Sequence, residues 1–539
     1  MKTIRVGRDA SLSALCLALL SACGGGGGGE SNSGSNEPTK NSISGVVANG
    51  YLSGATVCLD LNADGRCGTG EPATVSGVNG AYQLNNITAG DESKYPILVE
   101  VPASAVDADT GKAVGKPYFL KSPAGHHAFV SPLTTLVQAQ IEAGKTTIQA
   151  EQIVRAELGK ITDANLGPYS NYLAGSNTAD YANLHAAAGI VAATVQNAYQ
   201  ALEGEAGRLG VQRVLAEVAM DTLRFQKNLE GGFSVSKGLG TQDNLSSLKR
   251  RAAALNETQG ARQAVSIRFA VKAGDQAVAC GLPVTLSQTV DHTSGATQIT
   301  SGQVADLRFY VSNIALIDAQ GKETFLTLDE NDNQSQDVAL LDFEDASGLC
   351  SKGTPATYTT LTGTVKAGTY VGLSMTLGVP IKTPKGNIGL NHSDTVASST
   401  PVLLQPKAMA WSWQGGRKFT KIEFTPEGGK NWTVHLGSTG CQGTNPANGE
   451  VLFCTNPNRV DYVFKRFNPA TELVVLDLNE LFRGSDVAFN TAGTAAGCMS
   501  ATNDPECAAI FKSLGLDLPH GMTLTDATQK TFALRSLTE

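Results

Sequence analysis

The sequence predicts a mainly β protein with a helical middle segment. Short runs of alternating apolar and polar residues, separated by turns rich in glycine and asparagine, occupy residues 43–122 and 263–539. They indicate a small β-sandwich and a large β-rich C-terminal domain. Residues 123–235 instead carry apolar side chains at helical spacing. A chain of 539 residues is expected to form two or three such domains.

The first 22 residues are expected to be a signal peptide. Lys2, Arg5 and Arg8 precede a short apolar run over residues 12–20. That run is too short to cross a bilayer as a stable helix, and a basic start followed by a short apolar core is typical of a secretion signal.

The end of this segment, Leu20-Ser21-Ala22-Cys23, resembles the bacterial lipobox. The resemblance implies cleavage before Cys23 and attachment of lipid to Cys23, whereas the alternative is an ordinary signal peptide with a chance cysteine. Gly24 stands where an aspartate would retain a lipoprotein in the inner membrane, so we expect an outer-membrane lipoprotein that faces the periplasm or the cell surface. Residues 23–42 are a glycine-rich tether.

A possible calcium loop lies between the second and third expected strands of the small sandwich. Aspartate, asparagine and glutamate are spaced as in an EF-hand loop, whose oxygen atoms bind a hard cation. The flanking residues are typical of strands, and the stretch resembles calcium-loop prealbumin-like β-sandwich repeats of bacterial surface proteins. The alternative is a solvated turn closed by a disulfide between Cys58 and Cys67. The candidate calcium ligands are Asp60, Asn62, Asp64, the Arg66 carbonyl and Glu71.

The middle segment shows helix signals but no recognisable chemistry. Ser131-Pro132 is a good start for a helix, and Thr146 with Gln149 forms a capping-box pattern. Later apolar residues at helical spacing predict two more helices, the first through Leu184 to Leu202 and the second through Leu215 to Phe225. Residues 236–262 are polar and are expected to be a linker.

Eight cysteines remain when Cys16 in the signal and Cys23 in the lipobox are set aside. An even number in an exported chain predicts disulfides. Besides Cys58 and Cys67, short sequence separation favours Cys441–Cys454 and Cys498–Cys507, which would leave Cys280 to pair with Cys350. Sequence alone leaves fifteen connectivities open for the last six cysteines.

Composition and motifs exclude several functions. The net charge of −8 argues against a nucleic-acid-binding surface. The sequence contains no Gly-x-Ser-x-Gly, His-Glu-x-x-His or P-loop motif. Asp342, Glu344 and Asp345 show no geometry that favours a hydrolase and are expected at the end of a strand. The chain is therefore not expected to be an enzyme.

Rare aromatic and imidazole groups gather in the C-terminal domain. Two of the three tryptophans, Trp411 and Trp413, are one residue apart, and Trp432 is the third. His392 and His435 lie on either side of the pair. Residues i and i+2 of a strand share a face, so we expect Trp411 and Trp413 to point the same way.

Five separated motifs resemble the MbnP-like family of periplasmic copper-binding proteins, in the subgroup with Trp-x-Trp and paired cysteines. The resemblance covers residues 263–539. The motifs are Asp306-Leu307-Arg308-Phe309-Tyr310-Val311-Ser312-Asn313, Asn391-His392-Ser393-Asp394, Met409-Ala410-Trp411-Ser412-Trp413, His435-Leu436-Gly437-Ser438-Thr439-Gly440-Cys441, and Gly497-Cys498-Met499-Ser500 with Asp504-Pro505-Glu506-Cys507.

The resemblance implies a copper site and a partner. A di-haem protein of the MauG-like cytochrome c peroxidase type would oxidise a tryptophan to kynurenine. The copper ligands would then be His392, His435 and a modified Trp411 or Trp413, and Asp394 would orient His392. Related proteins carry Trp-x-His, so Trp413 stands where they have a ligand, which leaves the ligand count and the modified tryptophan open.

A second interpretation belongs to a different class of function. Paired tryptophans on a strand are often core residues or stacking platforms for sugars. A cell-surface adhesion or glycan-binding lipoprotein would use Trp411, Trp413 and Trp432 for stacking, with the calcium loop stiffening a stalk.

Overall fold

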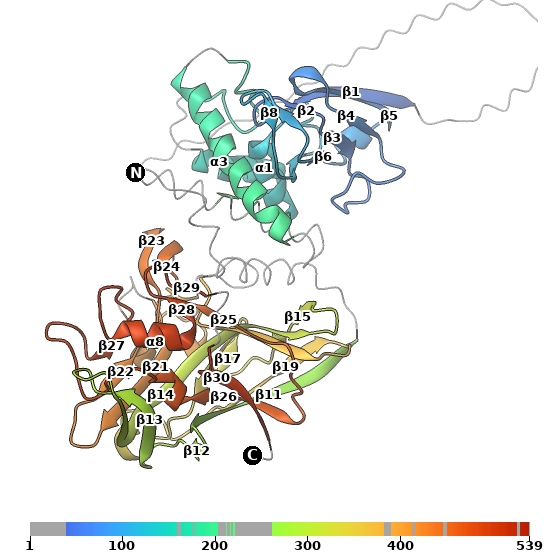
Figure 1. Ribbon diagram of the computed structural model, residues 1–539. Coiled ribbons are helices and arrows are strands. Elements are labelled where there is room, and N and C mark those ends of the chain that lie inside the picture. Colours follow the sequence, from blue (N-terminus) through green and yellow to red (C-terminus); the bar gives the residue numbers. More distant parts are fainter. Residues whose placement is uncertain are drawn as a thin grey trace, which may run out of the picture. The chain divides into compact units, whose positions relative to one another are not determined.

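The mainly β architecture is confirmed by the computed structural model (Figure 1). It describes residues 39–158, 163–175, 178–202, 212, 216, 219–220, 261–381, 390–411, 416–445, 450–524 and 529–537. The expected signal peptide, nearly all of the tether, most of the helix expected over Leu215–Phe225 and almost the whole linker lie outside these residues. No helix in the described ranges combines the length and apolar character that a membrane span requires.

Among the described residues, the N-terminal part forms small sheets and several helices. Strands lie at the runs where alternation predicted them. Burial alternates along residues 81–84, where every second side chain enters the core, whereas residues 118–122 are buried throughout. One sheet contains β1 (Lys40–Val47), β5 (Ala81–Thr88) and β10 (Phe129–Val130); a second contains β3 (Thr56–Leu59), β4 (Ala73–Val75), β6 (Ile97–Val101) and β9 (Tyr118–Ser122); a third contains β2 (Leu52–Ser53), β7 (Val106–Asp107) and β8 (Lys112–Ala113).

Helix α1 (Pro132–Glu142) and helix α2 (Thr147–Glu157) begin where the capping signals predicted. Ser131 caps α1, and the Thr146 hydroxyl accepts the Gln149 backbone N–H at 3.3 Å. These bonds satisfy donors that the first helical turn leaves without a partner. Helix α3 (Ala179–Leu202) covers the helix expected through Leu184 to Leu202.

Strands and helices of this part share one hydrophobic core. The cluster contains side chains from the small sheets and from α1 and α3, so it runs across the expected boundary between residues 122 and 123. The rings of Phe119 in β9 and Tyr199 in α3 lie 5.7 Å apart. The Thr134 hydroxyl in α1 donates to the Lys121 carbonyl at 2.7 Å, which ties the helix to β9 directly.

Two larger sheets form the C-terminal part. The first contains β16 (Thr327–Leu328), β19 (Thr360–Lys366), β11 (Arg262–Ala273), β26 (Glu472–Asp477) and β30 (Phe532–Ser536), with β12 (Gln276–Ala277) beside β11. The second contains β17 (Gln334–Ser335), β18 (Val338–Asp342), β14 (Thr297–Ile317), β21 (Thr420–Pro426), β22 (Trp432–Val434) and β27 (Gly497–Cys498), joined by β13 (Val284–Val290), β15 (Glu323–Phe325), β20 (Gly372–Leu377) and β25 (Val460–Phe464). Short hairpins and helices complete it: β23 (Thr439–Asn445) with β24 (Glu450–Asn456), β28 (Leu516–Asp517) with β29 (Met522–Thr523), α7 (Leu478–Leu481) and α8 (Cys507–Leu514).

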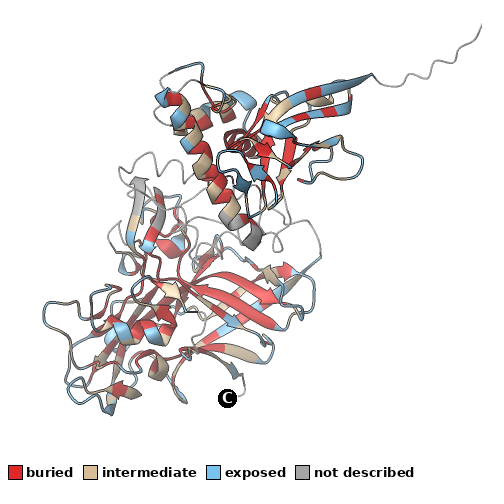
Figure 2. Cartoon of the chain, turned by 45° about the horizontal axis from the view of Figure 1, so that its top comes forward, coloured by how far each residue is buried: buried red, intermediate tan, exposed pale blue. Residues whose placement is uncertain are grey.

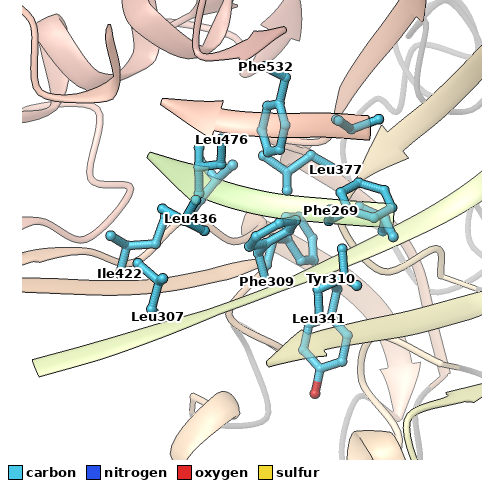
Figure 3. Close-up of a cluster of buried hydrophobic side chains, with 14 of the residues drawn as sticks. Phe269, Leu307, Phe309, Tyr310, Leu341, Leu377, Ile422, Leu436, Leu476 and Phe532 are labelled. Atoms are coloured by element: carbon cyan, nitrogen blue, oxygen red, sulfur yellow. The ribbon is translucent and has the colours of Figure 1, made fainter. Parts of the chain in front are cut away.

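The inner face of β14 forms the centre of the C-terminal core. The Phe309 ring lies 6.4 Å from that of Phe269 in β11 and 5.6 Å from that of Phe532 in β30, so the two sheets pack face to face (Figure 3). Burial is continuous along the second half of β14, whereas β11 buries every second residue (Figure 2). A β-bulge between Val304 and Asp306 keeps both Val304 and Leu307 in this core despite their odd spacing.

The outer face of β14 is covered as well. Tyr310 is fully buried, and its hydroxyl points away from the phenyl rings of the core and donates to the Leu403 carbonyl at 2.7 Å (Figure 3). Leu403 belongs to the short 3₁₀ turn Val402–Leu404, within the segment that carries His392 and Trp411. The segment with the candidate site residues therefore lies on the sheet rather than in solvent.

A row of buried ionic groups crosses the same outer face. Arg308 donates to the Asp306 carboxylate at 2.9 and 2.5 Å and lies 3.6 Å from Glu344. Lys421 lies 2.5 Å from Asp306 and 2.7 Å from Glu423. In the β14–β21 register Arg308 lies opposite Lys421 and Asp306 opposite Glu423, so like charges face each other directly. The attractive contacts run along each strand and diagonally between Lys421 and Asp306, and these offset the like-charge pairs.

Within the described part of the chain, disulfides join Cys58 to Cys67, Cys280 to Cys350, Cys441 to Cys454 and Cys498 to Cys507. This is the pairing that short sequence separation favours. Cys441 and Cys454 face each other directly in the β23–β24 hairpin.

We predict that Asp342, which pairs with Arg308 in the β14–β18 register, makes stability fall as the pH rises. Burial raises its pKa from 3.8 to about 7, although its bond with the Glu344 backbone opposes this. Between these values the folded state binds more protons than the unfolded state, so the free energy of unfolding declines with increasing pH. Asp342→Asn keeps the shape without the ionisation and should lose that part of the decline.

Urea unfolding of both proteins at several pH values within and above this window tests the prediction. All three tryptophans belong to the C-terminal part, so their fluorescence reports on its unfolding. Parallel pH dependences for the wild type and the variant would contradict it.

Candidate metal centre

Arg417 fixes the turn that carries His392. Its guanidinium is buried and donates to the Asn391 carbonyl at 3.2 Å, the Ser393 carbonyl at 2.8 Å and the Leu404 carbonyl at 2.8 Å. The first two acceptors are the residues on either side of His392. The Arg417 backbone N–H also donates to the Asn391 side chain at 2.9 Å. The backbone position of His392 is thus set by a single buried cation.

His392 lies beside a disulfide. Its side chain is 3% exposed. A ring nitrogen of His392 and the two sulfurs of Cys441 and Cys454 all lie within 4.8 Å of one another. Among the described residues, this is the one group of three or more histidine, cysteine or acidic side chains that gathers so closely.

His435 is held by Glu423. Its ring is buried, and its Nε2 lies 3.0 Å from a carboxylate oxygen of Glu423. A carboxylate only accepts hydrogen bonds, so the Nε2 carries the proton and donates it. The buried Nδ1 then has a lone pair and no hydrogen-bond partner among the described residues. An imidazole of this kind can bind a cation, with a carboxylate orienting it from behind.

Electrostatics keep this pair in the form that binds cations. Burial lowers the pKa of His435, although the hydrogen bond with Glu423 opposes this, so the ring is neutral at pH 7. Burial on its own would raise the pKa of Glu423, but hydrogen bonds from His435 and Lys421 bring that pKa well below its ordinary value. Glu423 therefore remains an anion that accepts the Nε2 proton.

Trp411 packs against the chain next to His435. It follows an isolated bridge between Ala410 and Arg417, and its backbone N–H donates to the Gly416 carbonyl at 2.9 Å. A Cβ built on Gly437 would lie 2.4 Å from the Trp411 ring, so the residue there must be glycine. Trp411 is half-buried. Trp413 lies outside the described residues, so the expectation that both rings share a face stays a prediction.

Further hydrogen bonds join the separated motifs. The Ser500 hydroxyl donates to the His435 carbonyl at 3.0 Å and accepts the Gly437 N–H at 3.0 Å. The His435 N–H donates to the Cys498 carbonyl at 2.9 Å. Asn391, next to His392, donates to the Ser438 hydroxyl at 3.5 Å. The structure thus brings the histidine, tryptophan and cysteine motifs into one region.

Glu423 is the site residue that sequence reasoning missed. Asp394, the expected orienting carboxylate, is exposed, and its side chain accepts the Val396 N–H at 3.0 Å. Glu423 pairs with Thr433 in the β21–β22 register, which puts it diagonally across from His435. One sequence signal was available. Glu423 lies two residues after Lys421 in an alternating strand, so the two charged side chains share a face.

Trp432, His292 and His520 lie in surroundings that do not point to a binding site. Trp432 is 3% exposed and donates from its ring to the Phe489 carbonyl at 3.1 Å. A buried ring of this kind cannot stack on a sugar, which removes one of the three platforms of the glycan-binding interpretation. His292 and His520 are exposed, and each lies beside a carboxylate, that of Asp486 and that of Asp517 respectively.

The candidate calcium loop is closed by internal hydrogen bonds. The Asp60 carboxylate accepts the Asp64 and Gly65 N–H groups at 3.1 and 3.2 Å. The Glu71 carboxylate accepts N–H groups of Leu61 and Gly68, both at 2.8 Å. Burial raises the pKa of Asp60, which nearby Lys121 partly offsets. Calcium binding at Asp60, Asn62, Asp64, Arg66 and Glu71 stays a prediction.

Comparison with known proteins identifies the relatives of the C-terminal part. The family model MbnP matches residues 262–500. A solved structure, MbnP from Methylosinus trichosporium, is 38% identical, and the match covers 51% of this chain and 99% of that chain with a TM-score of 0.45. No curated protein matches the chain.

Proposed function

This chain belongs to the MbnP family, and we propose that it is a periplasmic copper-binding protein that is not itself an enzyme. The proposed ligands are His392, His435 and either Trp411 or Trp413 after oxidation to kynurenine. The observation that supports this most strongly is the buried His435, whose Nε2 is held by Glu423 while its Nδ1 has no partner among the described residues.

The residues present fit a copper ion. A buried nitrogen lone pair without a hydrogen bond is costly unless something binds it. Imidazole nitrogen suits copper of either charge, and so does the aromatic amine of kynurenine. Glu423 fixes the tautomer and orientation of the His435 ring, and Arg417 fixes the backbone turn that carries His392, before a metal arrives.

The half-buried Trp411 supports the proposed modification. Its ring lies against Gly437 yet remains partly accessible, so an oxidising partner can act on it without unfolding the core. The proposed partner is a di-haem protein of the MauG-like cytochrome c peroxidase type. Dioxygen activated by the partner would cleave the C2–C3 bond of the indole and leave one oxygen atom on each carbon. Water would then remove C2 as formate and leave an aromatic amine, which is a better metal ligand than the indole nitrogen it replaces.

We predict that lipid on Cys23 anchors the protein to the outer membrane. The lipobox-like sequence before Cys23 is the motivation. Cys23→Ser should shift the protein from the membrane fraction to the soluble fraction of its host. Retention of this variant on membranes would show that another element anchors the chain.

We predict that copper affinity depends on both histidines and on one tryptophan. All variants are made together with the di-haem partner. His392→Ala and His435→Ala should each weaken copper binding. Of Trp411→Phe and Trp413→Phe, the one that removes the modified tryptophan should also weaken it. Glu423→Gln removes the charge behind His435 and should cost about 10- to 100-fold in affinity. Affinity should fall at acidic pH because a protonated imidazole cannot bind a metal. Burial lowers the pKa of His435, so the fall due to this ring should lie below the ordinary value of about 6.5.

Matched variants separate ligand loss from general damage. His520→Ala removes an exposed histidine, and Trp432→Phe removes a core tryptophan, so neither should change copper affinity. The intact mass of the purified protein shows whether a tryptophan has become kynurenine, because this change has the net effect of losing one carbon and gaining one oxygen. If neither histidine variant changes the affinity, the site is elsewhere, and if neither tryptophan variant does, copper binds through unmodified side chains.

We predict that calcium stabilises the N-terminal part through the loop at Asp60 to Glu71. A ligand that binds only the folded state raises the melting temperature. Calorimetry with calcium and with chelator should show the difference, and Asp64→Asn should reduce it because the loop loses one ligand charge. The Asp64 side chain is exposed, so the change should leave the fold intact. Identical melting curves with calcium and with chelator would remove the proposal.

A further inference from the structure

We propose that reduction of the Cys441–Cys454 disulfide creates a second metal site, in which two cysteine sulfurs and His392 bind a soft cation such as Cu(I). This site shares His392 with the copper site proposed above. It does not require Trp411, Trp413 or His435, so either site can exist without the other.

The geometry of the three donors supports this site. The His392 nitrogen and the sulfurs of Cys441 and Cys454 lie within 4.8 Å of one another. Metal–nitrogen and metal–sulfur bonds are about 2.0–2.3 Å long, which puts ligand atoms of one ion about 4 Å apart. Small movements of two side chains after the sulfurs separate are therefore enough to surround an ion.

Burial favours the same site. His392 is 3% exposed and Cys454 is 5% exposed, so two of the three donors are already shielded from water. Arg417 holds the backbone on both sides of His392, which keeps the turn in place when the cysteines separate. Only the sulfurs have to rearrange.

The oxidation state of sulfur decides which ligands are available. A disulfide sulfur is a poor ligand, whereas thiolates are strong ligands that select Cu(I). Reduction breaks the S–S bond with two electrons and two protons and forms two thiols. A dithiol reductant, such as a thiol–disulfide oxidoreductase, supplies both and becomes a disulfide itself. Metal binding then releases the two thiol protons.

Accessibility singles out this disulfide within the C-terminal part. Cys280, Cys350, Cys498 and Cys507 are all buried, whereas Cys441 is half-buried. An incoming thiolate therefore reaches the Cys441 sulfur first. In the described residues β23 and β24 pair only with each other, so opening their disulfide need not disturb the two large sheets.

The test uses the mature full-length protein under anaerobic conditions, with and without a mild dithiol. Co(II) is added as a spectroscopic probe, and Cu(I) affinity is measured against a chromophoric chelator. After reduction we expect a sulfur-to-cobalt charge-transfer band and a gain of more than about tenfold in Cu(I) affinity. Bound metal should also protect Cys441 and Cys454 from alkylation, as mapped by mass spectrometry.

Variants connect the signal to these residues. Cys441→Ser with Cys454→Ser should abolish the band and the gain in affinity, and His392→Ala should shift the band and weaken binding. Cys58→Ser with Cys67→Ser is the matched control, because it removes another half-buried disulfide and should leave both readouts intact.

Two results would overturn the proposal. One is equal Cu(I) affinity before and after reduction of this disulfide, including the case in which reduction disorders the hairpin. The other is a band that persists in the Cys441→Ser, Cys454→Ser protein. Copper binding by the unreduced protein is measured separately, so its loss would count against the proposed function alone.

Discussion

The candidate metal centre depends on a buried cation, Arg417. A buried guanidinium is costly unless its donors are satisfied, and here backbone carbonyl groups satisfy them. Hydrogen bonds from a charged group contribute about 1.5–3 kcal/mol each. If His392 moved, the carbonyls of Asn391 and Ser393 would move with it and leave these donors unpaired. The turn is therefore rigid in the absence of metal, as a preorganised site requires.

Strand β14 connects this region to the protein core. Its inner face carries Phe309, which packs between the two sheets, and its outer face carries Asp306 and Arg308. The ionic row continues through Lys421 to Glu423, which orients His435. Removing one buried member would leave its partner uncompensated. The orientation of a candidate ligand is thus linked to the packing of the sandwich.

Sequence reasoning predicted what local patterns determine. Alternation gave the strands, capping patterns gave the starts of α1 and α2, and short separations gave the disulfides. It missed Glu423 and Arg417 because their roles depend on partners brought near by folding. Glu423 reaches His435 across 12 positions and Arg417 reaches Ser393 across 24. Charged residues on a strand or in a loop are usually solvated, and nothing in the pattern shows that a second segment covers them.

The disulfide beside His392 also bears on the order of events in the proposed site. Thiolates are oxidised readily. Trp411 packs against Gly437, and Cys441 lies only a few residues after that glycine. Free thiols there would compete with the indole ring for an oxidising partner. A closed Cys441–Cys454 bond removes this competition, because its sulfurs are already oxidised and react less readily than thiolates. Disulfide formation before tryptophan oxidation is therefore the productive order, and the same bond determines whether His392 is accompanied by sulfur ligands.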